Sequence, residues 1–345
     1  MAMSAVTTSE HDLLMQHCIS YRLSQSNIII DGVDSLSFEK YPFIPDIIDC
    51  MAPRITVIKG AQMGFTIGFI AKVLELAKRG NMRGIGYYFP TEGEVSDFAK
   101  ARFSTMMDDN HDLWGQHVQD TDSAALKKIG KTHLYFRGVG QRGSGAAGRS
   151  TSKLKSIPND AQVLDEKDEM DVGRVAAVTH RMDASSFAMQ WALSTPTLPG
   201  FGVDYDYTLS DQSVWMIKCG RCNDWCCLDL DYPDCIAEPH NKEAFFKCSK
   251  CHRKLDPVKH EWVARKPDLT KDHRGFWISQ LGAMRKSAQF FIDALLQAQA
   301  DGTEHEMQNQ NLARAFAYTD QEITDEQLRA AATTETKPHQ HTKHT

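Results

Sequence analysis

The feature that most limits how this chain can fold is a β-branched run followed by glycines and then by an amphipathic segment. Residues 55–58, Ile-Thr-Val-Ile, have the composition of a short buried strand. Residues 66–79 place apolar side chains at helical spacing, at Ile67, Ile70, Ala71, Leu74 and Ala77. A strand that passes through a glycine turn into a helix predicts an α/β fold.

The same alternation continues along the chain. Residues 84–89 form a second expected strand that stops at Pro90, and a helix is expected from Glu92 to Met107. Further strands are expected at residues 134–136, 162–164, 188–193 and 275–281, and a further helix at 289–300. This order favours a parallel sheet with helices on both faces.

The turn between the first strand and helix has the length of a phosphate-binding loop. It comprises Lys59, Gly60, Ala61, Gln62, Met63, Gly64, Phe65 and Thr66. In the standard loop a lysine directly precedes the final Ser or Thr, and backbone N–H groups at the helix N-terminus hold the phosphate. Here Phe65 takes that position, and Lys59 is the loop's one cation, long enough to fold over it. Thr66 would bind Mg²⁺; a glycine turn without a ligand is the alternative.

An expected strand ends in two adjacent carboxylates, in the run Val163-Leu164-Asp165-Glu166. In phosphoryl-transfer ATPases the first acid holds Mg²⁺ and the next carboxylate orients the attacking water. The alternative is a strand that ends in solvated acids, since Asp168, Glu169 and Asp171 follow. Together with the phosphate loop, Asp165 and Glu166 predict a P-loop ATPase of the ASCE, helicase-like type.

Seven of the nine cysteines lie between Cys219 and Cys251. Two CxxC pairs, Cys219 with Cys222 and Cys248 with Cys251, have the spacing of zinc knuckles and predict one tetrahedral Zn²⁺ site in an inserted zinc ribbon. The remaining three cysteines of this segment, Cys226, Cys227 and Cys235, do not form a second pair of knuckles. Basic residues around the knuckles suit either phosphate contacts or a solvated face.

Composition and charge narrow the class of protein further. The 345 residues are 41% hydrophobic and 24% charged, as in a globular enzyme, and the net charge of −6 argues against a wholly basic nucleic-acid coat. No apolar run approaches the ~20 residues that span a bilayer, and the first residues lack the features of a signal peptide. We therefore expect a cytoplasmic protein without a membrane partner.

The expected domain organisation follows from these motifs. It consists of an N-terminal region (1–45), an ATPase core (46–212), the zinc ribbon (213–262), a return to the core (263–320) and a disordered tail (321–345).

Taken in order, these motifs resemble the large subunit of phage terminases of the lambda type. The resemblance covers roughly residues 40–320. It rests on the phosphate loop with its lysine at the front, Pro90-Thr91, the glycine-rich stretch leading through residues 148–156, the acidic strand end 164–169, the run Ser194-Thr195-Pro196-Thr197, and the two cysteine knuckles.

The resemblance implies an ATPase with Glu166 and Lys59 as catalytic residues and with ATP, Mg²⁺ and Zn²⁺ as cofactors. It implies that Ser194 and Thr195 sense the γ-phosphate and that Phe43 stacks on adenine. Arg142 or Arg149 would contact phosphate or DNA.

The resemblance also implies partners and a compartment. The partners are double-stranded DNA, a small terminase subunit, a capsid portal and further copies of the chain, in the cytoplasm of a bacterial host. Members of the family carry a C-terminal nuclease domain, and only a short polar stretch follows residue 320. We therefore do not expect DNA cleavage by this chain alone.

Two other functions remain open at this point. One is a zinc-ribbon DNA-binding protein whose ATP site has decayed, and the other is a helicase-like ATPase. ATP turnover relative to a Glu166→Ala variant separates the first from a motor, and strand separation of a forked duplex identifies the second.

Overall fold

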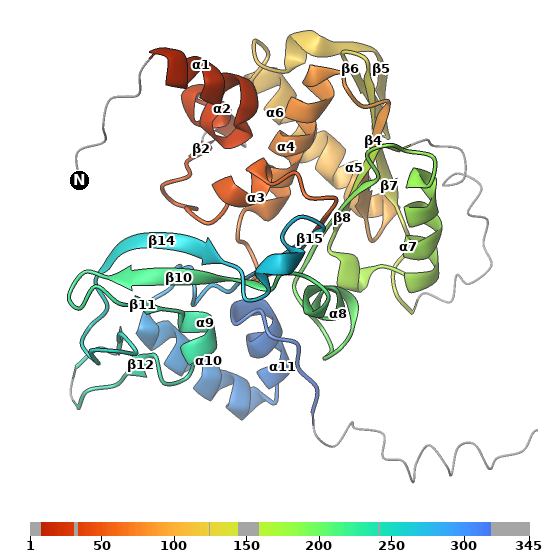
Figure 1. Ribbon diagram of the computed structural model, residues 1–345. Helices are drawn as coiled ribbons and strands as arrows, with labels where there is room; N and C mark the ends of the chain where they lie inside the picture. The colour runs from red at the N-terminus through yellow and green to blue at the C-terminus, as the bar shows by residue number, and fades with distance from the viewer. Residues whose placement is uncertain (1–7, 31–33, 124, 144–158, 241, 319–345) are drawn as a thin grey trace, which may run out of the picture.

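The computed structural model describes residues 8–30, 34–123, 125–143, 159–240 and 242–318. Within them the largest element is an eleven-stranded sheet in the order β11-β10-β15-β3-β9-β8-β4-β7-β6-β5, with β14 also paired to β10 (Figure 1). Its strands are β3 (Arg54–Lys59), β4 (Gly84–Phe89), β5 (Val118–Ser123), β6 (Leu126–Ile129), β7 (Thr132–Gly138), β8 (Ala161–Asp165), β9 (Met189–Ser194), β10 (Ser213–Cys219), β11 (Trp225–Cys226), β14 (Pro257–Val263) and β15 (His273–Ile278).

The middle of this sheet is parallel and its two edges are antiparallel. All neighbouring pairs from β10 through β15, β3, β9, β8 and β4 to β7 run parallel. At one edge β6 is antiparallel to β7 and β5 to β6, and at the other edge β11 and β14 are antiparallel to β10. The predicted parallel core is confirmed, and the antiparallel edges extend it into a mixed sheet.

Helices cover both faces of the sheet, as predicted. They include α3 (Pro45–Asp49), α4 (Phe65–Arg79), α5 (Glu92–Phe98), α7 (Val172–Thr179) and α8 (Gly202–Thr208). On β3, Ile55 and Val57 join the apolar core that contains α3, α4 and α5, whereas Ile58 joins a second core with side chains of α7 and α8. Because successive strand side chains point to opposite faces, this division places the two helix layers on opposite sides of the sheet.

The helix predicted from Glu92 to Met107 is divided into three pieces. It begins with a capping box, in which the side chains of Thr91 and Glu94 bond each other's backbone N–H groups. A π-helical turn at Ala99–Phe103 then separates α5 from α6 (Ser104–Asp109). Such turns insert one residue per turn and are frequent at functional sites.

The cysteine-rich segment is continuous with the sheet. Within the range 213–262, predicted as an insertion, β10 and β14 belong to the main sheet. The remainder carries α9 (Leu228–Asp231) and a small pair formed by β12 (Ile236–Ala237) and β13 (Phe245–Phe246). Figure 1 shows α10 (Ala288–Asp301) and α11 (Glu304–Glu306) beside this part of the molecule.

The described chain begins with two helices and a short strand pair. Helices α1 (Thr8–His17) and α2 (Ile19–Gln25) and the short pair β1 (Ile29–Ile30) and β2 (Asp34–Ser35) precede the sheet. The tail predicted at 321–345 lies outside the described residues. Among the helices that are described, none is long and apolar enough to cross a membrane.

A buried lysine joins the first helix layer to the sheet. The Nζ atom of Lys72, on α4, lies 2.5 Å from the carbonyl oxygen of Cys50 and 4.2 Å from the ring centre of Trp191 on β9. Its side chain is fully buried, and this burial lowers the pKa of the ammonium group to about 7. The folded protein therefore releases this proton at a lower pH than the unfolded chain does.

We expect Lys72 to make the protein more stable as the pH rises from about 7 toward 10. In this window the unfolded chain still binds the proton and the folded chain has lost it, so the free energy of unfolding increases with pH. Lys72→Met should remove this part of the pH dependence in urea titrations. Lys78→Met, on the same helix but partly exposed, is the matched control and should retain it. Equal slopes for wild type and Lys72→Met would contradict the expectation.

Candidate active site and metal centre

Three strand ends meet at one edge of the sheet. β9 lies between β3 and β8, with Ile58 opposite Ser194 and Leu193 opposite Asp165. Because the carboxyl ends of parallel strands open on the same edge, the residues that follow them are brought together there. The phosphate loop, the acidic pair and the loop after Ser194 are therefore neighbours.

The phosphate loop turns tightly before α4 begins. Gln62 and Gly64 both have left-handed backbone conformations, with φ of 56° and 78°. A Cβ atom on Gly64 would lie 3.3 Å from the ring of Tyr41, so the position combines a positive φ with close packing. The turn leads into α4 at Phe65, and the free N–H groups of a helix N-terminus attract an anion.

The ring of Phe65 occupies the apolar core. Its centre lies 5.6 Å from that of Phe43, which in turn lies 6.2 Å from Trp215. The adenine-stacking role that the resemblance implied for Phe43 is wrong, because its side chain is completely buried. Tyr41 is the partly exposed ring beside Gly64, and the guanidinium of Arg285 lies 4.5 Å above it.

Lys59 reaches across the strand ends to the acidic pair. Its Nζ atom donates to Oε1 of Glu166 over 2.6 Å. The lysine side chain is 6% exposed and the glutamate 37% exposed, so the glutamate faces the opening of the site. Glu166 itself has a φ of 58°, a strained conformation for a residue with a side chain.

The loop at 194–197 holds two of the acids that follow β8, Glu166 and Asp168. Ser194 Oγ and the N–H of Thr195 donate to Oε2 of Glu166, over 3.3 and 3.4 Å. The N–H and hydroxyl of Thr197 donate to Oδ2 of Asp168, over 3.0 and 3.1 Å. Ser194 and Thr195 thus contact the carboxylate that the sequence predicted to be catalytic.

Asp165 has the environment of a cation ligand. Its Oδ2 accepts the hydroxyl proton of Tyr87 over 2.8 Å, while its buried Oδ1 has no hydrogen-bond partner among the described residues. Burial and the charge of Glu166 raise the pKa of Asp165 to about 6, and Lys59, Tyr87 and Thr66 act in the opposite direction. An unpartnered carboxylate oxygen close to a hydroxyl fits Mg²⁺, which prefers oxygen ligands.

A cavity of about 300 Å³ opens at this edge of the sheet. It is lined by Thr66, Phe89, Pro90, Glu94, Asp97, Phe98, Ala101, Arg102, Asp165 and Glu166. Glu94, Asp97 and Arg102, from α5 and the π-helical turn, line this cavity although no sequence motif predicted them. Nothing local in the sequence marks them, because their position depends on how this helix packs.

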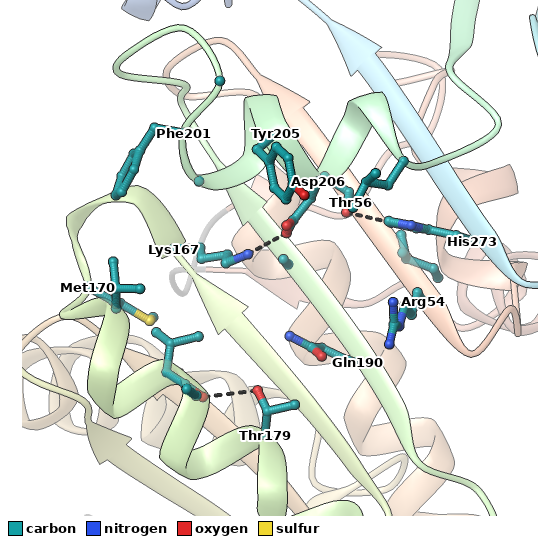
Figure 2. A pocket seen from close by; sticks show the side chains of 18 of the residues that line it. Arg54, Thr56, Lys167, Met170, Thr179, Gln190, Phe201, Tyr205, Asp206 and His273 are labelled. Atoms are coloured by element: carbon teal, nitrogen blue, oxygen red, sulfur yellow. Dashed lines mark hydrogen bonds and ion pairs between the residues drawn. The ribbon is translucent and has the colours of Figure 1, made fainter.

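A larger cavity of about 510 Å³ lies between α7 and α8, on the other helix layer (Figure 2). Lys167 is paired with Asp206 there, and Thr56 with His273 over 2.9 Å. Its lining contains neither the phosphate loop nor Asp165 and Glu166. The smaller cavity is therefore the one that brings together Thr66, Asp165 and Glu166.

Of the two arginines predicted to contact phosphate or DNA, Arg142 lies within the described residues and Arg149 does not. Nη1 of Arg142 lies 3.5 Å from the Thr197 hydroxyl, and its guanidinium lies 4.7 Å above the ring of Phe201. Arg149 and the whole stretch at 148–156 lie outside the described residues.

The four predicted zinc ligands converge. The Sγ atoms of Cys219, Cys222, Cys248 and Cys251 all lie within 4.8 Å of one another. Those of Cys222 and Cys248 are 3.7 Å apart, close to the ~3.8 Å edge of a tetrahedron with ~2.3 Å Zn–S bonds. The donor set therefore fits a structural Zn²⁺.

The two knuckles have the same backbone conformation. In each knuckle the backbone N–H of the residue four positions after the first cysteine donates a hydrogen bond to the carbonyl oxygen of that cysteine. Asn223 donates to Cys219, and His252 donates to Cys248. Asn223 and His252 both have left-handed conformations, with φ of 62° and 56°. The three other cysteines of the segment, Cys226, Cys227 and Cys235, are buried and outside the cluster.

The fold and this edge of the sheet define a P-loop ATPase. A family model described as the ATPase domain of the phage terminase large subunit gpA matches residues 34–270. This is more than half of the chain. The chain therefore belongs to the gpA family of phage terminase large subunits, within the ATPase domain.

Solved structures of phage terminases are similar at low sequence identity. The large terminase ATPase domain of Thermus phage P74-26 is 12% identical, with 81% of this chain and 97% of that chain covered and a TM-score of 0.46. The large terminase of bacteriophage HK97 is 13% identical, with 86% and 55% covered and a TM-score of 0.49. The large terminase of a thermophilic bacteriophage in complex with ADP is 13% identical, with 75% and 46% covered and a TM-score of 0.41. The comparison with curated proteins gave no match.

We expect the purified protein to contain one equivalent of Zn²⁺, held by four thiolates in a closed shell. Cys248→Ser should lose the metal and lower the thermal stability, because metal binding contributes directly to folding. Cys235→Ser, in the same segment but outside the cluster, should retain it. Elemental analysis by mass spectrometry measures both. A metal-free wild-type protein with an intact fold would contradict this expectation.

Proposed function

We propose that this chain is the ATP-hydrolysing motor of a phage terminase and moves double-stranded DNA into a procapsid. The observation that carries the proposal is the contact between Lys59 and Glu166, at the edge where the phosphate loop, Asp165 and the 194–197 loop meet. These are the parts that phosphoryl transfer requires, namely a phosphate cradle, a metal ligand and a group that orients water. Family membership supports the same conclusion.

In this proposal the loop before α4 binds the phosphates. Lys59 supplies the positive charge that the standard loop takes from a lysine at the position of Phe65. Backbone N–H groups of Gln62 to Thr66 supply hydrogen bonds, because those of Gly60 and Ala61 already donate to the carbonyls of Ile278 and Gln310. The side chains of Met63 and Phe65 are buried and do not take part. Arg102 lines the same cavity and adds a second cation.

Thr66 and Asp165 would hold Mg²⁺ through the hydroxyl and the free Oδ1. When bound, this ion neutralises charge on the β- and γ-phosphates. The two residues come from the start of α4 and the end of β8, so the ion's position is fixed by the sheet.

Glu166 would orient the attacking water. Its carboxylate pairs with Lys59 and accepts hydrogen bonds from Ser194 and Thr195. Phosphate competes for the ammonium of Lys59, because a charged lysine pairs with either anion. ATP binding would thus release Glu166 as a hydrogen-bond acceptor for water while Ser194 and Thr195 keep it in place.

The adenine ring would stack on Tyr41. This side chain is partly exposed beside Gly64, and Arg285 covers its ring and donates to the carbonyl of Lys40 over 3.1 Å. Phe43 stabilises Tyr41 from below through an edge contact, with ring centres 6.1 Å apart.

The partners in this proposal are double-stranded DNA, a small terminase subunit, a capsid portal and further copies of the chain, in a bacterial host's cytoplasm. The exposed side chains of Arg221, Lys250, Arg253 and Lys254 on the two knuckles suit contacts with DNA phosphates.

We expect Glu166→Gln and Lys59→Ala each to lower kcat for ATP hydrolysis by about 10²-fold or more, as loss of a water-orienting or charge-stabilising group does. Glu169→Gln is the matched control, since Glu169 is exposed three residues away, and it should retain activity. Steady-state phosphate release measures all three. Wild-type turnover no higher than that of Glu166→Gln would exclude the motor and favour a DNA-binding protein with a decayed ATP site.

For the motor, we expect double-stranded DNA to raise the ATPase rate and the protein to displace a triplex-forming strand without separating a forked duplex. Added salt should weaken the DNA effect steeply, because phosphate contacts release counterions. Unwinding of the fork would instead identify a helicase-like ATPase.

A further inference from the structure

A segment far from the phosphate loop in sequence holds that loop. After α11, the π-helical turn at Met307–Asn311 brings the carbonyl oxygen of Gln310 to 2.7 Å from the N–H of Ala61. The carbonyl oxygen of Ala61 accepts from the side-chain amide of Gln280 over 2.8 Å. Both backbone polar groups of this loop residue are thus bonded from outside the loop.

Gln280 and Asn311 fix each other. The backbone N–H of Gln280 donates to the carbonyl of Asn311, and the side-chain amide of Asn311 donates to Oε1 of Gln280, each over 3.0 Å. Oε1 is thereby occupied, so Nε2 of Gln280 remains directed at Ala61. The fit is close, because a Cβ atom on Gly60 would lie 3.1 Å from both the Gln280 nitrogen and the Gln310 oxygen.

The same segment continues to the loop that holds Glu166. The N–H of Phe316 donates to the carbonyl of Thr197 over 3.0 Å. Between these two ends, the carbonyl of Ala313 accepts from the indole of Trp277 over 2.9 Å, and Nη2 of Arg314 donates to the carbonyl of Asp229. Residues 307–316 therefore touch the phosphate loop at one end and the 194–197 loop at the other.

We propose that residues 307–316 form a strap that sets the phosphate loop against the loop holding Glu166, with Gln280 and Asn311 as positioning residues for ATP hydrolysis. The inference rests on the proposed ATPase function. Single neutral hydrogen bonds contribute little each, whereas bonds to both groups of Ala61 and to Thr197 restrict two loops at once. The strap restricts the conformations of both loops before ATP binds, so that binding costs less conformational entropy. In this sense the strap preorganises the site.

The first test separates the two ends of the strap by their kinetic effects. Gln280→Ala and Asn311→Ala should raise KM for ATP by about tenfold with kcat within about twofold, because they loosen the phosphate loop. The double variant should be no worse than either single variant, since the two side chains act as one pair. Gln297→Ala is the control, on α10 and bonded to Asp301. Unchanged KM in both single variants would overturn the proposal.

The second test concerns the bond to Thr197. Phe316→Pro removes the N–H, whereas Phe316→Ala removes the ring and keeps the N–H. We expect Phe316→Pro alone to lower kcat, by about tenfold, with KM near the wild-type value. Ala317→Pro controls for chain stiffness, since its N–H has no partner within the described residues. Equal kcat for Phe316→Ala and Phe316→Pro would overturn the role of this bond.

A third measurement is independent of catalysis. Hydrogen exchange of the Ala61 amide, without nucleotide, should be slow in the wild type and faster in Asn311→Ala, with unchanged thermal unfolding. If the wild type hydrolyses no ATP, the proposed function fails, and this exchange rate still decides whether the strap holds the loop. Fast exchange of Ala61 in the wild type would show that it does not.

Discussion

The site depends on one constraint, which is that β9 lies between β3 and β8. The parallel arrangement places Lys59, Ser194 and Asp165 in one row at the carboxyl edge, with the Ser194 strand in the middle. Lys59 then reaches Glu166 by crossing over the end of β9. The loop that follows Ser194 can therefore contact any group that lies between Lys59 and the acidic pair of Asp165 and Glu166.

The replacement of the usual loop lysine by Phe65 has a structural reason. At the start of α4 this position points into the core, where Phe65 meets Phe43, and Phe43 meets Trp215 of β10. The cation of the loop is instead Lys59, at the end of β3, where it pairs with Glu166. Phe65 thus contributes to the core through Phe43, and Lys59 remains available to pair with Glu166.

The sequence predicted those elements whose pattern is local. The strand before Lys59 and the helix after Gly64 are confirmed, and the four cysteines of the knuckles lie together, because periodicity and CxxC spacing are properties of short segments. Phe43 was misjudged, because burial depends on Trp215, far away in sequence. Arg102 and the bond from Gln310 to Ala61 were missed for the same reason, since they result from long-range packing that no short motif records.

The continuity of β10 with the sheet has a mechanical consequence. One end of this strand pairs with β15, the neighbour of β3, and the other end carries the first thiolate, Cys219, ~20 Å away for seven extended residues. A ribbon on a loose linker would swing without resistance. Here a force applied at the knuckles would be carried as shear along paired strands to β3, which ends in Lys59, so the knuckles cannot swing freely relative to the loop that follows β3.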